Sequence, residues 1–162
     1  MKHLLKVKQS LFHKGEFDEE HVFDSYAHWF WNGGFDMGPT MSNVMFFTEE
    51  GLSIEEAVSK NHRHTPRGTA GIGPAHRSAP LLLFAKDEEI VELAKREAKL
   101  THFDPLAGRA SAISLLICQY LLQNISFKTI EYNIKEVFGR EFLLGSEDLD
   151  TSGYAPRVIE AS

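Results

Sequence analysis

The sequence has few of the features that mark secreted or membrane-spanning proteins. Cys118 is the only cysteine among 162 residues, which excludes a disulfide framework and a zinc site built on cysteines. The longest apolar run, residues 113–122, contains Ser114 and Gln119 and is too short to cross a bilayer. The N-terminus has no continuous apolar segment typical of a signal peptide. We therefore expect a cytoplasmic protein with no membrane partner.

Positive charge is also scarce. The chain has 17 lysines and arginines against 23 aspartates and glutamates, for a net charge of -6. The basic residues are scattered rather than clustered, so we expect no nucleic-acid partner. Cys118 lies in the apolar stretch AISLLICQYLL, which predicts a buried side chain rather than a reactive thiolate.

The period-two alternation of β-strands is missing, and apolar residues recur at helical spacing through almost the whole chain. The fold class predicted is all-α, in a single domain spanning residues 1–162. Residues 61–73 are expected to form a loop because of their glycine, proline and threonine content. Helices are expected over residues 1–15, 19–32, 39–45, 53–60, 74–84, 88–100, 105–122 and 126–139.

One candidate site is the stretch LTHFDPLAGRA, residues 100–110. Asp104 followed by Pro105 is typical of a helix start, because the carboxylate can accept from a backbone N–H and proline needs no donor there. Capping does not account for His102, which offers hydrogen-bonding nitrogens near a helix N-terminus where anions such as phosphate are favoured. Two interpretations stay open, an ordinary histidine in a turn or a ligand-binding turn.

A second candidate is GTAGIGPAHR, residues 68–77. Glycines at Gly68, Gly71 and Gly73 precede Pro74, and their backbone N–H groups could cradle a phosphate or a ribose. An ordinary loop is the alternative. The stretch lacks the lysine and hydroxyl residue of a P-loop and follows no predicted strand, which argues against nucleoside-triphosphate and Rossmann sites.

Three further groups are weaker candidates. Asp36 in FDMGPT is either a turn residue or a carboxylate presented to a site. His62 and His64 could bind a metal together, but no third ligand lies nearby and both are expected to be solvated. The acidic stretch EDLDT, residues 147–151, lacks EF-hand spacing and is interpreted as a solvated linker.

Taken in order, these stretches resemble one family. The motifs are WFWNGGFDMGPT at residues 29–40, GIGPAHRSAPL at 71–81, AKLTHFDPLA at 98–107 and TSGY at 151–154, followed by VIEA. The sequence resembles the middle portion of an ADP-ribosylglycohydrolase of the dinitrogenase-reductase-activating type. The resemblance implies an orthogonally packed helical fold, hydrolysis of the bond between ADP-ribose and a protein side chain or small acceptor, and a pair of Mg²⁺ or Mn²⁺ ions.

The resemblance also implies a ligand site for ADP-ribose or an ADP-ribosylated substrate. In such proteins the glycine-rich loop is expected to cradle the phosphates and ribose, with the threonine-histidine turn lining the same pocket. The implied positions are Gly71, Gly73, Pro74, His102 and Asp104 in or near the cleft, with Asp36 and Gly38 on its rim. Ile72 and His76 depart from the family pattern, where an asparagine and a methionine are usual.

The family's two metal motifs belong before and after this chain. Asp148-Leu149-Asp150-Thr151 imitates the second motif, but it precedes the Tyr154 landmark that the motif should follow. We therefore expect a domain incomplete at both ends, with no catalytic or metal-ligating residue, no bound Mg²⁺ or Mn²⁺, and little hydrolase activity alone. The alternatives are a non-catalytic ADP-ribose or nucleotide-binding module, or a helical subunit whose exposed faces are covered by a second copy or a partner chain.

Overall fold

The computed structural model describes residues 17–35, 37–83, 85 and 88–139. Apart from an isolated bridge residue at Gly71, the regular structure of this part is helical, which confirms the all-α fold class. The elements are α2 (Glu19–Trp31), α3 (Pro39–Glu49), α4 (Ile54–His64), η1 (Pro66–Gly68), α5 (Gly73–Arg77), η2 (Ala79–Leu83), α6 (Ile90–Lys99), α7 (Pro105–Leu122) and α8 (Phe127–Phe138).

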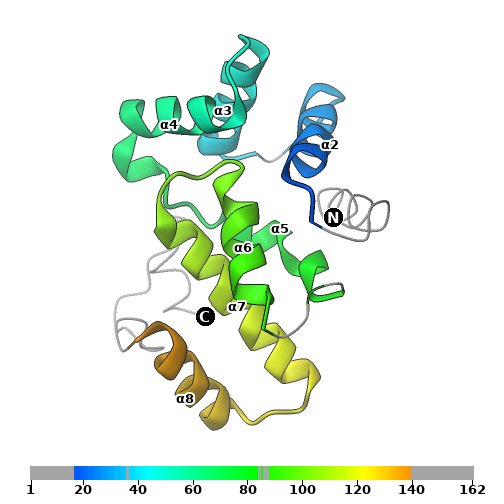
Figure 1. Cartoon of the computed structure of the whole chain (residues 1–162), viewed down its shortest axis with the longest axis vertical. Coiled ribbons are helices and arrows are strands. Elements are labelled where there is room, and N and C mark those ends of the chain that lie inside the picture. The colour runs from blue at the N-terminus through cyan, green and yellow to red at the C-terminus, as the bar shows by residue number, and fades with distance from the viewer. Residues whose placement is uncertain (1–16, 36, 84, 86–87, 140–162) are drawn as a thin grey trace.

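The helices are arranged around α6 and α7, which pack side by side in the middle of the molecule (Figure 1). Helix α5 and η2 pack against this pair, α8 contacts α7, and α3 and α4 pack on each other at the opposite end from α8. The hydrophobic core draws on α2, α3, α4, η2, α6, α7 and α8. The turn between α6 and α7 and the loop between α4 and α5 therefore come from segments that pack together.

Local signals set most helix starts. Asp18, Ser53, Asp104 and Ser126 each accept a hydrogen bond from a backbone N–H in the first turn of the following helix. These bonds satisfy donors that have no partner inside the helix. Ser53 and Glu56 form the complete capping box that their spacing predicts.

Helix α7 is the core helix. Its small residues allow a close crossing, since a Cβ on Gly108 would lie 3.2 Å from the Cα of Lys95 in α6. By length and hydropathy α7 is the one described helix that meets the minimum for a membrane span, with half of it buried inside the molecule. A central helix of a globular core has the same apolar character, and α7 packs on α5, α6 and α8.

Several predicted boundaries and orientations were wrong. Helix α4 continues to His64 rather than ending near Lys60. Helix α6 begins at Ile90 rather than at residue 88, with no side-chain cap. Cys118 is exposed, not buried, because α7 turns Leu115, Leu116 and Gln119 inward. The helix expected over residues 1–15 and the stretches at 147–154 lie outside the described residues.

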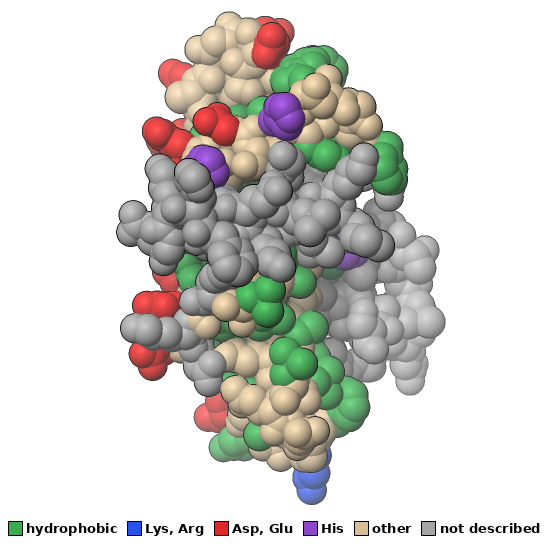
Figure 2. Space-filling model, turned by 90° about the vertical axis from the view of Figure 1, so that its right-hand side faces the viewer, with side chains coloured by type: hydrophobic (Ala, Val, Ile, Leu, Met, Phe, Trp, Pro, Cys, Tyr) green, Lys and Arg blue, Asp and Glu red, His purple; other side chains and the backbone are tan. Residues whose placement is uncertain are grey.

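Exposed hydrophobic side chains gather over the lower half of one face (Figure 2). Among the large hydrophobic side chains of the described residues, Leu122 is 76% and Phe127 is 72% exposed, where α7 ends and α8 begins. These exposed side chains bear on the prediction of self-association or a partner chain, which stays a prediction.

Candidate functional site

His102 lies on the turn that joins α6 to α7. Its imidazole faces residues 68–73, the glycine loop that leads into α5. A Cβ built on Gly71 would come within 3.3 Å of His102 Nε2, and one on Gly73 within 3.4 Å of Cε1. Both distances are at the tight edge of ordinary packing, so glycine allows the backbone of the loop to approach the ring. Two stretches predicted as separate candidates thus form one site.

A chain of hydrogen bonds runs behind the imidazole. The hydroxyl of Tyr26 donates to Glu97 Oε1 at 2.7 Å, and Arg77 Nε donates to the same oxygen at 2.5 Å. Arg77 Nη2 donates to Thr101 Oγ1 at 2.6 Å, and Thr101 Oγ1 lies 2.8 Å from His102 Nδ1. None of the five residues is more than 5% exposed. The chain therefore connects α2, α5 and α6 to the His102 turn through the protein interior.

This environment sets the charge of the site. Burial, and then the positive charge of Arg77, lower the pKa of His102 to about 3. Burial, and then the carboxylate of Glu97, raise the pKa of Tyr26 well above its ordinary value. At neutral pH the imidazole is therefore uncharged and the phenol keeps its proton, while Arg77 and Glu97 form a buried ion pair.

His62 belongs to this site, although the sequence predicted a solvated histidine in a loop. It lies in the last turn of α4, where its Nδ1 is 2.8 Å from Thr69 Oγ1. Its ring stacks on Phe103, with centroids 4.2 Å apart and planes at 16°. Ala57, Val58 and Asn61 form the buried face of this helix, and the polar Asn61 adds no apolar residue to the pattern that would have extended it in the sequence.

His64 does not join His62 in a metal site. Its Nδ1 lies 2.7 Å from the carbonyl oxygen of Lys60 within its own helix, and the side chain is exposed. No third ligand stands beside the pair among the described residues, where no group of three or more histidines, cysteines or acidic residues lies close enough to hold an ion.

The remaining predicted residues occupy several roles. Asp104 accepts from Leu106 N at 2.9 Å, so its capping role is confirmed. Pro74 is buried in the first turn of α5. Gly38 is the N-cap of α3, with open space around its Cβ position. Asp36 lies outside the described residues.

The start of α3 is tied to the glycine loop by one bond. Thr40 Oγ1 donates to the carbonyl oxygen of Gly68 at 2.8 Å. The FDMGPT stretch, of which Gly38 is part, therefore borders the same loop as His102. This arrangement accords with the predicted rim position of Gly38, whose contact with a ligand stays a prediction.

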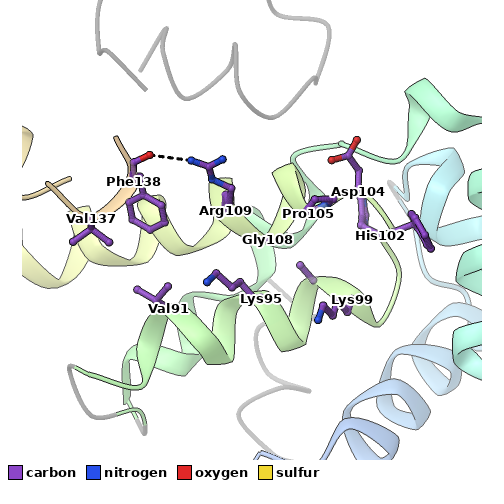
Figure 3. A pocket seen from close by; sticks show the side chains of 12 residues that line it. Val91, Lys95, Lys99, His102, Asp104, Pro105, Gly108, Arg109, Val137 and Phe138 are labelled. Carbon is purple, nitrogen blue, oxygen red and sulfur yellow. Dashed lines mark hydrogen bonds between the residues drawn. The ribbon is translucent and has the colours of Figure 1, made fainter. Parts of the chain in front are cut away.

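A cavity of about 520 Å³ lies on the other side of the His102 turn, between α6, α7 and α8 (Figure 3). Its charged lining comes from Lys95, Lys99, Arg109 and Asp104. The imidazole of His102 points away from Lys95 and Arg109 (Figure 3). His102 and Phe103 also line the cavity, which therefore adjoins the glycine-loop site at the His102 turn.

The described residues do not fit the pair of divalent ions that the resemblance implies. Mg²⁺ and Mn²⁺ need several oxygen ligands in fixed geometry, and the acidic residues beside His102 are otherwise engaged. Glu97 is paired with Arg77, and the Asp104 carboxylate caps α7. No catalytic step through a metal follows from this part of the chain.

The model of the ADP-ribosylglycohydrolase family matches residues 2–158. No curated protein matches the chain. The family match does not separate subtypes, so the dinitrogenase-reductase-activating type stays a prediction. Since the match covers nearly all 162 residues and the described part is helical as expected, the chain belongs to the ADP-ribosylglycohydrolase family.

Proposed function

We propose that the chain recognises the ADP-ribosyl group of ADP-ribosylated substrates on the face formed by the glycine loop and the His102 imidazole. Family membership implies a hydrolase-type function on such substrates. Gly71, Gly73 and His102 supply the recognition step of that function. Its main support is the tight approach of the imidazole to the loop backbone, at a position where Nε2 has no hydrogen-bond partner among the described residues.

The chemistry of the site suits this ligand. ADP-ribose offers phosphate and hydroxyl oxygens that accept hydrogen bonds, and a loop rich in glycine exposes backbone N–H groups to them. The stacked rings of His62 and Phe103 lie beside the loop, and Phe103 is half exposed, at 49%. An exposed aromatic surface next to hydrogen-bond donors is a common arrangement for binding a nucleotide base.

Hydrolysis is proposed to be weak or absent in this chain alone. The family is generally metal-dependent, and the donor set of the described residues does not hold a metal. The facing pair of carboxylates that glycosidases use without a metal has no counterpart at His102, since Asp104 and Glu97 are both engaged. The location proposed for the protein is the cytoplasm.

Calorimetric titration with ADP-ribose tests the recognition step. Binding heat is expected for the wild type, and at least a tenfold weaker affinity for His102→Ala. The matched control is His28→Ala, an exposed histidine on α2, which should bind as the wild type does. No heat for the wild type would overturn the proposal.

Release of ADP-ribose from ADP-ribosylated arginine or serine peptides tests the catalytic statement. With excess Mg²⁺ or Mn²⁺, we expect little or no release. Rapid release abolished by EDTA would overturn the proposed weakness of hydrolysis while leaving the recognition site in place. Binding without release is the result expected for a non-catalytic ADP-ribose module.

A helical subunit that completes its fold with another chain is the second candidate, favoured by the exposed Leu122 and Phe127. Light scattering coupled to size exclusion would detect self-association. A strictly monomeric chain that unfolds cooperatively would count against this candidate.

A further inference from the structure

We infer that Arg77 and Thr101 are positioning residues that hold His102 as the tautomer protonated on Nε2, so that the imidazole acts as a hydrogen-bond donor toward the ligand. The group recognised at this point would be an acceptor oxygen, such as that of a phosphate or hydroxyl. The identity of the ligand rests on the proposed function, whereas the tautomer rests on the hydrogen bonds alone.

The direction of the bonds follows from the chemistry of their donors. A guanidinium has N–H donors and no acceptor, so Arg77 Nη2 must donate to Thr101 Oγ1 across their 2.6 Å contact. The hydroxyl thereby accepts from Arg77 and keeps its own hydrogen to donate. Its remaining neighbour within hydrogen-bond distance is His102 Nδ1 at 2.8 Å.

The opposite tautomer would leave the buried Thr101 hydroxyl without an acceptor for its hydrogen. If Nδ1 carried the hydrogen, Thr101 Oγ1 would accept two bonds and its own hydrogen would face no other acceptor among the described residues. Thr101 is fully buried, and a buried donor without an acceptor is costly. The hydroxyl therefore donates to Nδ1, and the neutral ring carries its hydrogen on Nε2.

Glu97 and Tyr26 keep Arg77 in the orientation that this requires. Glu97 Oε1 accepts from Arg77 Nε at 2.5 Å and from the Tyr26 hydroxyl at 2.7 Å. The guanidinium also lies over the Tyr26 ring, 4.9 Å from its centre. Held on both sides, Arg77 presents Nη2 to Thr101, and the tautomer is set by a group that stays charged at all accessible pH values.

The tautomer determines what the second ring nitrogen, Nε2, can do. Nε2 lies closest to the Gly71 position of the loop, and it is not one of the polar side-chain atoms that are fully buried without a partner. A ligand oxygen there would receive a hydrogen bond. Because Nε2 already carries hydrogen and the Nδ1 lone pair is taken, His102 has no lone pair with which to act as a general base.

Nitrogen NMR tests the tautomer directly. In the full chain with ¹⁵N-labelled histidine at pH 7, we expect the His102 Nε2 signal to be of the protonated type and Nδ1 to be of the unprotonated type. Thr101→Val removes the hydroxyl while keeping the branched shape, and should give a mixture of tautomers. Thr101→Ser keeps the hydroxyl and should restore the wild-type pattern.

A protonated Nδ1 in the wild type would overturn the inference, and so would an unchanged pattern in Thr101→Val. The wild-type spectrum alone is decisive if Thr101→Val fails to fold. The exposed His28 and His64 provide internal references in the same spectrum.

Binding separates this inference from the proposed function. Thr101→Val should weaken ADP-ribose binding roughly 2- to 10-fold, the value of one neutral hydrogen bond, while Thr101→Ser retains it. The expected tautomer without ADP-ribose binding would overturn the proposed function alone. ADP-ribose binding with a protonated Nδ1 would overturn the tautomer alone.

Discussion

Gly71 and His102 are 31 positions apart in the sequence, yet a single methyl group on Gly71 would come within 3.3 Å of Nε2. The absence of a side chain at position 71 therefore lets the glycine loop lie directly against the histidine turn.

Gly71→Ala should displace the imidazole by a few tenths of an ångström, and should weaken ADP-ribose binding. It should also lower the free energy of unfolding by about 1 kcal/mol, in the range of overpacking. Chemical denaturation would measure the cost. In a His102→Ala background the added methyl group meets no ring, so the cost should vanish there, and an equal cost in both backgrounds would contradict the contact.

Acid should destabilise the fold through His102. Its folded pKa is about 3, whereas an unfolded histidine titrates near 6.5. As the pH falls below 6.5, His102 binds a proton in the unfolded chain, whereas in the folded chain it stays neutral until about pH 3. The stability present above pH 6.5 is thus lost across this window, by about 5 kcal/mol in total.

Urea unfolding at pH 7 and pH 4.5 checks this expectation. His102→Gln should lose less stability on acidification than the wild type, whereas the exposed His28→Gln should lose as much. Glu19, whose pKa is lowered by its hydrogen bond with Arg96, also loses stabilisation in acid but does so equally in each variant. Arg77, whose charge acts on His102, is retained in each variant. An identical pH dependence for wild type and His102→Gln would exclude a buried neutral imidazole.

Breaking the buried ion pair should be costly. Glu97→Gln replaces the carboxylate that faces Arg77 with a neutral amide. Glu97 Oε2 is buried without a hydrogen-bond partner among the described residues, so an amide NH₂ at that position would find no acceptor. Loss of roughly 3 kcal/mol is expected, since the buried guanidinium keeps its charge. The exposed pair of Lys60 and Glu50 supplies the control: Glu50→Gln should cost less than about 1 kcal/mol. Equal effects of the two variants would refute the buried pair.

Asp104 separates capping from ligand binding. Asp104→Ser keeps an oxygen that can cap α7, and should retain most of the stability, whereas Asp104→Ala should lose about 1 kcal/mol. Thermal unfolding measures this difference, and calorimetry measures ADP-ribose affinity in the same two variants. If affinity falls in Asp104→Ser while stability holds, the carboxylate contributes to recognition as the family resemblance implies.

Local chemistry explains which parts of the fold could be predicted from the sequence. The helix starts at Asp18, Ser53, Asp104 and Ser126 depend on side chains within three residues of the first turn, so spacing alone located them. The start of α6 has no side-chain cap, and it was misplaced. The orientation of Cys118 depends on which face of α7 meets its neighbours, and composition does not contain that information.

The site required information from distant parts of the chain. Its two main stretches were each ambiguous in isolation, and the family resemblance brought them together. The bonds between Tyr26, Glu97 and Arg77 were not predicted, because they join three separate helices. A signal did exist in α6, where Glu97 stands beside Ala94 and Ala98 on the buried face. A charged residue at such a position needs a buried partner.

The stack of His62 on Phe103 determines which helices a bound ligand would stabilise. Helices α3 and α4 pack mainly on each other and η1, whereas α6 packs chiefly on α7. The stack joins α4 to the turn between α6 and α7, beside the glycine loop, and so crosses between these two groups. A ligand bound there would contact both groups of helices and hold them together. We expect ligand binding to slow amide hydrogen exchange in α4 more than in α8, which lies at the opposite end of the molecule from α4 (Figure 1).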